Sequence, residues 1–75
     1  METVELICAA RAAVLNRNET PVRLYLTKQD HIALCDELRH DFSVAAPFMG
    51  MPITEAVTGT VSRVLSETGF AVALR

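Results

Sequence analysis

The sequence has no tryptophan, only two cysteines, and three residues each of glycine and proline in a chain of 75. Two cysteines allow at most one disulfide bond, which excludes a disulfide-rich scaffold. No run of about 20 uncharged apolar residues is present, so we expect no membrane-spanning segment. The chain has nine acidic and seven basic side chains, so it lacks the basic surplus that is typical of a dedicated nucleic-acid binder.

Motifs of common catalytic centres are missing as well. The glycines stand at positions 50, 59 and 69, without the spacing of a phosphate-binding loop. The sequence contains neither a Cys-x-x-Cys pair nor a serine nucleophile motif. A chain this short rarely builds both a pocket and the shell of residues that supports it. We therefore expect a protein that is not an enzyme and binds no cofactor.

The composition is that of a small globular protein. Apolar residues make up 51% of the chain and charged residues 21%, which argues against disorder. The length fits one domain over residues 1–75. Glu2 and Glu5 at the start, and Arg11 within the first apolar segment, are unlike a secretory signal. We expect a cytoplasmic protein whose two cysteines are buried, reduced thiols. Because so short a chain buries only about 60% of its unfolded surface, a partner chain is a common source of further stability.

The first predicted element is a helix over residues 3–17, which is rich in alanine and leucine and begins with Thr3 as its N-cap. At 100° per residue, its apolar side chains extend over more than half of its circumference. A helix that rests on one sheet needs an apolar stripe of only about 100° or somewhat more. We therefore expect a second contact, made by another subunit, on the side that carries Val4, Cys8 and Leu15.

A strand and a second helix are predicted next. Apolar and polar residues alternate over residues 22–26, which predicts a half-buried strand with Val22 on its inner face and Arg23 and Tyr25 on its outer face. Thr27 begins a Thr-x-x-Asp cap, and the helix that follows is predicted to run to about His40.

The apolar spacing of this second helix predicts which of its side chains are buried. Ile32, Leu34, Cys35 and Leu38 share one face. Asp30 lies on the predicted outer face, in solvent.

The remaining part of the chain has a less regular pattern. Residues 41–50 are predicted to be irregular, and residues 53–57 to form a short strand. Residues 58–69 fit either a helix or a β-hairpin, and we favour the hairpin, with Gly69 at the left-handed position of its loop. The unbroken apolar run over residues 70–74 predicts a strand that is buried on both faces.

These elements predict an α+β fold: two helices packed on one face of a small sheet of three to four strands, with a C-terminal β-hairpin. We expect the strands at residues 22–26 and 70–74 to pair with each other. The predicted core consists of Leu6, Ile7, Ala10, Val14, Leu24, Leu26, Ile32, Cys35, Leu38, Phe70, Val72 and Leu74.

The main functional hypothesis is a non-enzymatic interaction or assembly module that self-associates, most simply as a two-fold homodimer. Exposed apolar patches on small proteins usually mark such contacts. The uncharged loop before residue 52 is a second source of contacts, because methionine adapts to its partners, although core filling is the commoner role of such methionines. The predicted protein interface consists of Val4, Cys8, Leu15, Phe48, Met49 and Met51.

Two alternatives remain open. Arg23, Tyr25 and Arg63 on an outer sheet face fit a small regulatory nucleic-acid-binding protein, although the mild acidity counts against it. His31 and Cys35, four residues apart on a helix, fit a metal site or a small enzyme. A structural zinc site needs two further ligands, and the ordinary interpretation is a core-edge histidine, hydrogen-bonded through one nitrogen, beside a buried thiol.

Overall fold

The structure, a computed structural model, describes residues 2–43 and 46–75. Its helices and strands are α1 (Glu2–Leu15), β1 (Pro21–Leu26), α2 (Lys28–Leu38), β2 (Pro47–Phe48), β3 (Met51–Glu55), β4 (Arg63–Ser66) and β5 (Ala71–Ala73). The strands form one sheet in the order β2-β3-β1-β4-β5. Strands β1 and β3 are parallel and are connected through α2, and every other neighbouring pair is antiparallel. The fold is therefore α+β with a mixed sheet of five strands, more than the three or four predicted.

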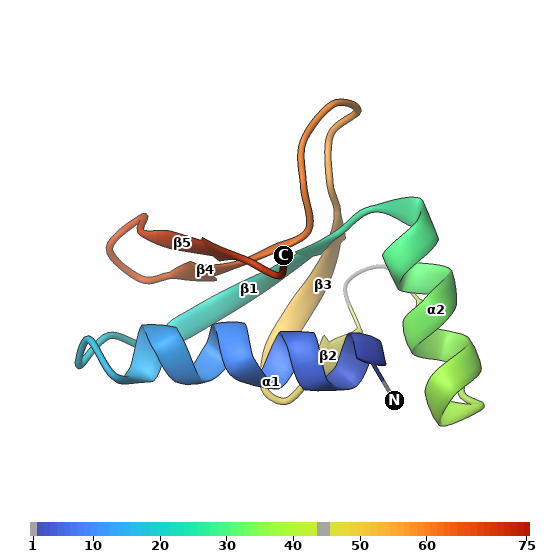
Figure 1. The fold of residues 1–75 in the computed structure, drawn as a ribbon, viewed down its shortest axis with the longest axis horizontal. Coiled ribbons are helices and arrows are strands. Elements are labelled where there is room, and N and C mark those ends of the chain that lie inside the picture. Colours follow the sequence, from blue (N-terminus) through green and yellow to red (C-terminus); the bar gives the residue numbers. More distant parts are fainter. Residues whose placement is uncertain (1, 44–45) are drawn as a thin grey trace.

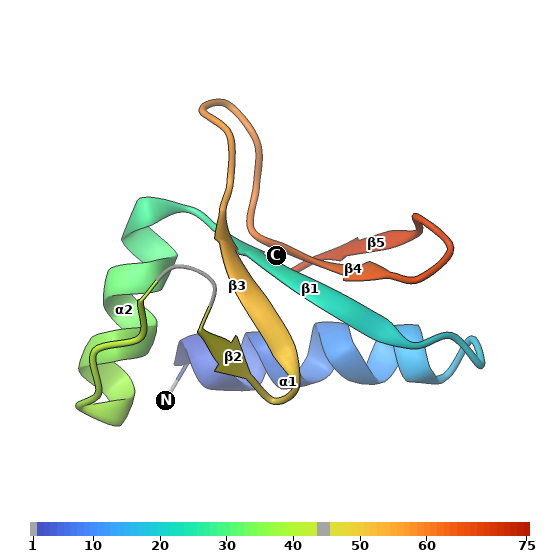
Figure 2. The ribbon, with the colours of Figure 1, turned by 180° about the vertical axis from the view of Figure 1, so that it is seen from behind.

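The helices and the sheet enclose one hydrophobic core. Helix α1 lies across the sheet and contacts β1, β4 and β5, whereas α2 lies at one end and contacts α1 and β1 (Figure 1). The opposite view shows the sheet in front of α1 (Figure 2). The buried apolar residues are Ile7, Ala10, Val14, Leu24, Leu26, Leu34, Met51, Ile53, Val64 and Leu74.

Helix α1 buries one stripe and begins one residue earlier than predicted. Thr3, Ile7, Ala10 and Val14, spaced four, three and four residues apart, form the buried stripe. Thr3 therefore lies inside the helix, and its prediction as the N-cap was wrong. The carboxylate of Glu37 on α2 takes over the capping role, since it accepts the backbone N–H of Thr3 at 3.0 Å and that of the following residue at 3.1 Å.

Helix α2 confirms the predicted cap and contradicts part of the predicted buried face. The Thr27 hydroxyl accepts the N–H of Asp30 at 3.2 Å. The helix ends at Leu38, slightly before the predicted end. Asp30 and Leu34, four residues apart, point inward, whereas Ile32 is 52% exposed. The predictions of a buried Ile32 and a solvent-exposed Asp30 were wrong, because polar partners from distant segments allow α2 to turn a carboxylate toward the body of the protein.

The stretch predicted to be irregular contains a tight hairpin instead. Strands β2 and β3 pair antiparallel, with Phe48 opposite Met51. Met49 and Gly50, between them, have φ of 53° and 80°, and a positive φ at both positions is typical of a type I′ turn. Val44 and Ala45, in the same stretch, lie outside the described residues.

The C-terminal strand differs from its prediction. Strand β5 pairs antiparallel with β4 and lies at an edge of the sheet, so the predicted pairing with the strand at residues 22–26 was wrong. Ala71 and Ala73 are exposed, so the strand is not buried on both faces. An apolar run cannot distinguish a doubly covered strand from an edge strand whose outer residues are small alanines. Val22 is also exposed, next to an irregularity in the β1–β4 register.

Candidate functional site

One flank of α1 carries the side chains that were predicted to contact another subunit. Val4, Cys8, Arg11 and Leu15 follow one another at spacings of four, three and four, which places them on one side of the helix. Val4 packs partly against the core, but Cys8 is exposed and Leu15 is 44% exposed. The chain itself therefore leaves half of this flank uncovered.

The turn between β2 and β3 adjoins the same flank. The Cys8 Sγ lies 3.8 Å from the Met49 Sδ, and both side chains are exposed. Cys8 is thus not the buried thiol that was predicted. We call Cys8, Leu15 and Met49 the α1–Met49 surface.

The other two loop residues of the predicted interface lie inside the chain. Phe48 is half-buried and packs against the core, with its ring edge-on to that of Phe42. Met51 is fully buried, and so it lies in the core and not on a surface. Because the turn has only two residues, Met51 is the first residue of β3, and this position of the strand faces the core.

The same flank contains an unsatisfied donor. The Nε of Arg11 is buried and has no hydrogen-bond partner among the described residues. A buried N–H without an acceptor costs on the order of 1–3 kcal/mol.

The face of the sheet that is turned away from the helices brings together the three residues of the nucleic-acid alternative. Tyr25 pairs with Arg63 across β1 and β4, and the Arg63 guanidinium lies 4.2 Å from the centre of the Tyr25 ring. Arg23 donates to the Thr54 hydroxyl at 2.7 Å on neighbouring β3. Both guanidinium groups are thus held against the sheet by residues of their own chain.

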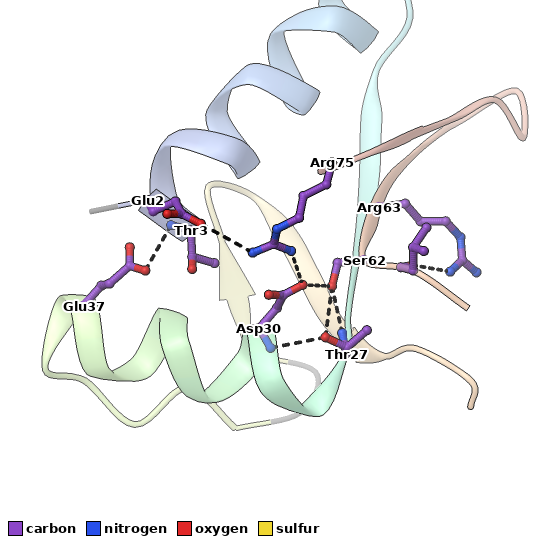
Figure 3. A network of polar contacts seen from close by, with 9 residues as sticks. Glu2, Thr3, Thr27, Asp30, Glu37, Ser62, Arg63 and Arg75 are labelled. Carbon is purple, nitrogen blue, oxygen red and sulfur yellow. Dashed lines mark hydrogen bonds and ion pairs between the residues drawn. The ribbon is translucent and has the colours of Figure 1, made fainter. Parts of the chain in front are cut away.

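A polar cluster that the sequence analysis missed joins α2, the segment before β4 and the last residue of the chain (Figure 3). The carboxylate of Asp30, a residue only 6% exposed, accepts the Ser62 hydroxyl and, at 2.9 Å, the guanidinium of Arg75. Ser62 in turn accepts the backbone N–H of Thr27 at 2.9 Å. The cluster borders a pocket of about 370 Å³.

The environment of Asp30 keeps it ionised. Burial raises its pKa, but the hydrogen bonds from Arg75 and Ser62 and the charge of Arg75 outweigh this effect, so the pKa lies below the ordinary value. The pKa of Arg75 is raised by the hydrogen bond to Asp30. Both hydrogen bonds go to Oδ2, and a carboxylate with a lowered pKa is poorly suited to general acid–base catalysis near neutral pH. The cluster therefore ties the C-terminus to α2.

His31 and Cys35 are arranged like an ordinary histidine and thiol at the edge of a hydrophobic core. The His31 Nε2 bonds the Phe42 carbonyl, and since a carbonyl only accepts, Nε2 is the donor. The Cys35 thiol lies 4.0 Å from the same oxygen and is half-buried. Within residues 2–43 and 46–75, no group of three or more His, Cys, Asp or Glu is placed to hold a metal ion.

Comparison with protein families, with curated proteins and with solved structures found no match to this chain. Among the described residues, α1 and α2 both fall short of the length and apolar character that a membrane crossing requires.

Proposed function

We propose that this protein is a non-enzymatic assembly module that self-associates, most simply as a two-fold homodimer, through the α1–Met49 surface. The observation that carries the proposal is the exposure of Cys8, Leu15 and Met49 on one side of the folded chain. These are apolar side chains, and two of them are in contact. A second copy that covers them removes apolar area from water, at roughly 25 cal/mol per Å².

The small size of the chain also favours a partner, because about 40% of the surface of the unfolded chain stays exposed after a domain of this length folds.

Sedimentation equilibrium at tens of micromolar tests the proposal. We expect the wild type to have at least twice the mass of one chain, and Leu15→Glu to lower the average mass at a given concentration. Ile32→Glu is the matched control, because Ile32 is a similarly exposed aliphatic residue on α2, outside the α1–Met49 surface. A monomeric wild type, or equal association of both variants, overturns the proposal.

A second candidate function is binding of single-stranded nucleic acid to the outer sheet face. It is favoured by one observation, the placement of Arg63 over the Tyr25 ring with Arg23 on the same face. Arginine and aromatic side chains together bind phosphates and stack on bases. Titration of a labelled single-stranded oligonucleotide tests it: we expect binding that weakens with salt and is lost in R23Q/R63Q. The absence of binding at low salt rejects it.

A further inference from the structure

The two edges of the sheet differ in how well they are protected against another strand. Strand β2 has only two residues and begins with Pro47, which has no backbone N–H to offer. Strand β5, with three residues, is also short, but it has no proline, and residues 70–74 carry no charge. Charges, prolines and very short strands are the usual means by which proteins block a sheet edge. Of the strands that the structure describes, β5 is the edge without proline or charge.

The hydrogen bonds to β4 fix which backbone groups of β5 are free. The Ser66 N–H donates to the Phe70 carbonyl at 2.7 Å, and the Leu74 N–H donates to the Ser62 carbonyl at 3.0 Å. In an antiparallel ladder, alternate residues direct both of their backbone groups to the same neighbour. Residues 70, 72 and 74 therefore face β4, and Ala71 and Ala73 direct their N–H and C=O groups outward. Both alanines are exposed.

We propose that β5 pairs antiparallel with β5 of a second copy, about a two-fold axis at Val72. This register places Ala71 of each copy opposite Ala73 of the other. Each of these two pairs joins residues whose N–H and C=O groups point outward, so each pair forms two backbone hydrogen bonds. The two five-stranded sheets then become one continuous sheet, and no charged side chain of residues 70–74 faces another across the axis.

Contacts at both ends of β5 show that α1 runs alongside this strand. The Arg75 guanidinium, after β5, lies 3.9 Å from the Glu2 carboxylate at the start of α1. The Arg17 guanidinium, just beyond the end of α1, lies 3.7 Å from the centre of the Phe70 ring, before β5. The flank of α1 that includes Glu2 is therefore the flank nearest to the free edge.

That flank is suited to a second helix. Glu2, Leu6, Ala9 and Ala13 follow one another at spacings of four, three and four, so they lie on one side of α1. Ala9 is exposed, and Ala13 is half-buried. Pairing of the two β5 strands brings the two α1 helices toward each other on the same side of the continuous sheet, and alanine side chains allow their backbones to approach closely.

This contact is separate from the α1–Met49 surface, which lies on the opposite flank of α1. The inference therefore does not rest on the proposed use of that surface. A chain that uses both contacts forms assemblies larger than a dimer.

A pair of variants with two substitutions each tests the register. In A71E/A73E, two pairs of like charges face each other across the axis, and we expect association to weaken by about tenfold. In A71K/A73E, the same positions form two pairs of opposite charges, and we expect association at least as strong as in the wild type. Both variants carry a glutamate at position 73, whose cross-strand neighbour on β4 is Arg63. Any contact of this glutamate with Arg63 within one chain is therefore the same in both variants.

Amide hydrogen exchange of the wild type gives an independent readout. We expect the Ala71 and Ala73 amides to exchange more slowly as the protein concentration rises. Equal association of the two variants, or exchange that does not depend on concentration, overturns the inference. An edge reserved for a strand of another protein leaves both amides fast-exchanging at every concentration of the pure chain and thus overturns it too.

The outcomes also separate this inference from the proposed function. If Leu15→Glu abolishes association and A71E/A73E does not, the edge pairing fails and the α1–Met49 surface stands. The reverse result supports the edge pairing and overturns the α1–Met49 surface. A wild type that is monomeric at every concentration overturns both.

Discussion

Replacing Asp30 with asparagine tests whether the buried carboxylate holds the C-terminus to α2. Asparagine keeps the shape of the side chain and one acceptor oxygen. It loses the negative charge of the carboxylate, to which the Ser62 hydroxyl and the Arg75 guanidinium donate hydrogen bonds. A hydrogen bond to a charged group contributes about 1.5–3 kcal/mol. The side chain of Arg75 is 53% exposed, so its ion pair adds at most about 1 kcal/mol. Because the amide still accepts one bond, we expect Asp30→Asn to destabilise the fold by about 2 kcal/mol.

Urea unfolding, followed by circular dichroism over a range of pH, measures this effect. The pKa of Asp30 is lowered in the folded state, so its ionised form contributes stability that is present above the unfolded pKa of about 3.9 and is lost as the pH falls through the folded value. We therefore expect the difference between wild type and Asp30→Asn to be constant near neutral pH and to shrink below about pH 4. Glu19 and Glu37, whose pKa values are lowered by the hydroxyls of Thr68 and Thr3, are present in both proteins.

Asp36→Asn is the matched control, because Asp36 is an exposed aspartate on the same helix. We expect it to change the free energy of unfolding by no more than about 0.5 kcal/mol. If Asp30→Asn costs no more than this control, or if its cost stays the same at pH values well below the unfolded pKa, the ionised carboxylate does not hold the C-terminus to α2.

Two further substitutions test the packing of the helices by the same urea unfolding. Leu34→Ala removes a fully buried side chain, and we expect it to cost about 2–5 kcal/mol, whereas Ile32→Ala on the exposed side of α2 is expected to cost less than about 1 kcal/mol; similar costs contradict the observed rotation of α2. Glu37→Gln weakens the cap on the first N–H groups of α1, and we expect a loss of stability at neutral pH that shrinks as the pH falls below the usual pKa of glutamate. An unchanged stability contradicts the capping role.

The local elements were predictable because each depends on residues close together in the sequence. The apolar spacing of α1, the alternation in β1 and the cap at Thr27 act within a few residues, and the structure contains all three. Asp30 was misplaced for the opposite reason: its partners lie 32 and 45 residues away. A sequence pattern shows that a carboxylate is polar, but it does not show that distant donors will satisfy it.

The candidate surfaces were predictable in part. The excess apolar circumference of α1 indicated Cys8 and Leu15, which the structure leaves exposed. Met49 and Met51 are the same residue type in the same uncharged stretch, yet the two-residue turn exposes Met49 and buries Met51. The free edge of β5 was not predictable, because its position depends on the order of the strands, which no local pattern of residues shows.

Sedimentation equilibrium of the wild-type chain, from about 1 µM upward, tests whether the protein self-associates. We expect a mass that rises with concentration to at least twice the 8.2 kDa of one chain. A mass of 8.2 kDa at every concentration, into the hundreds of micromolar, contradicts it.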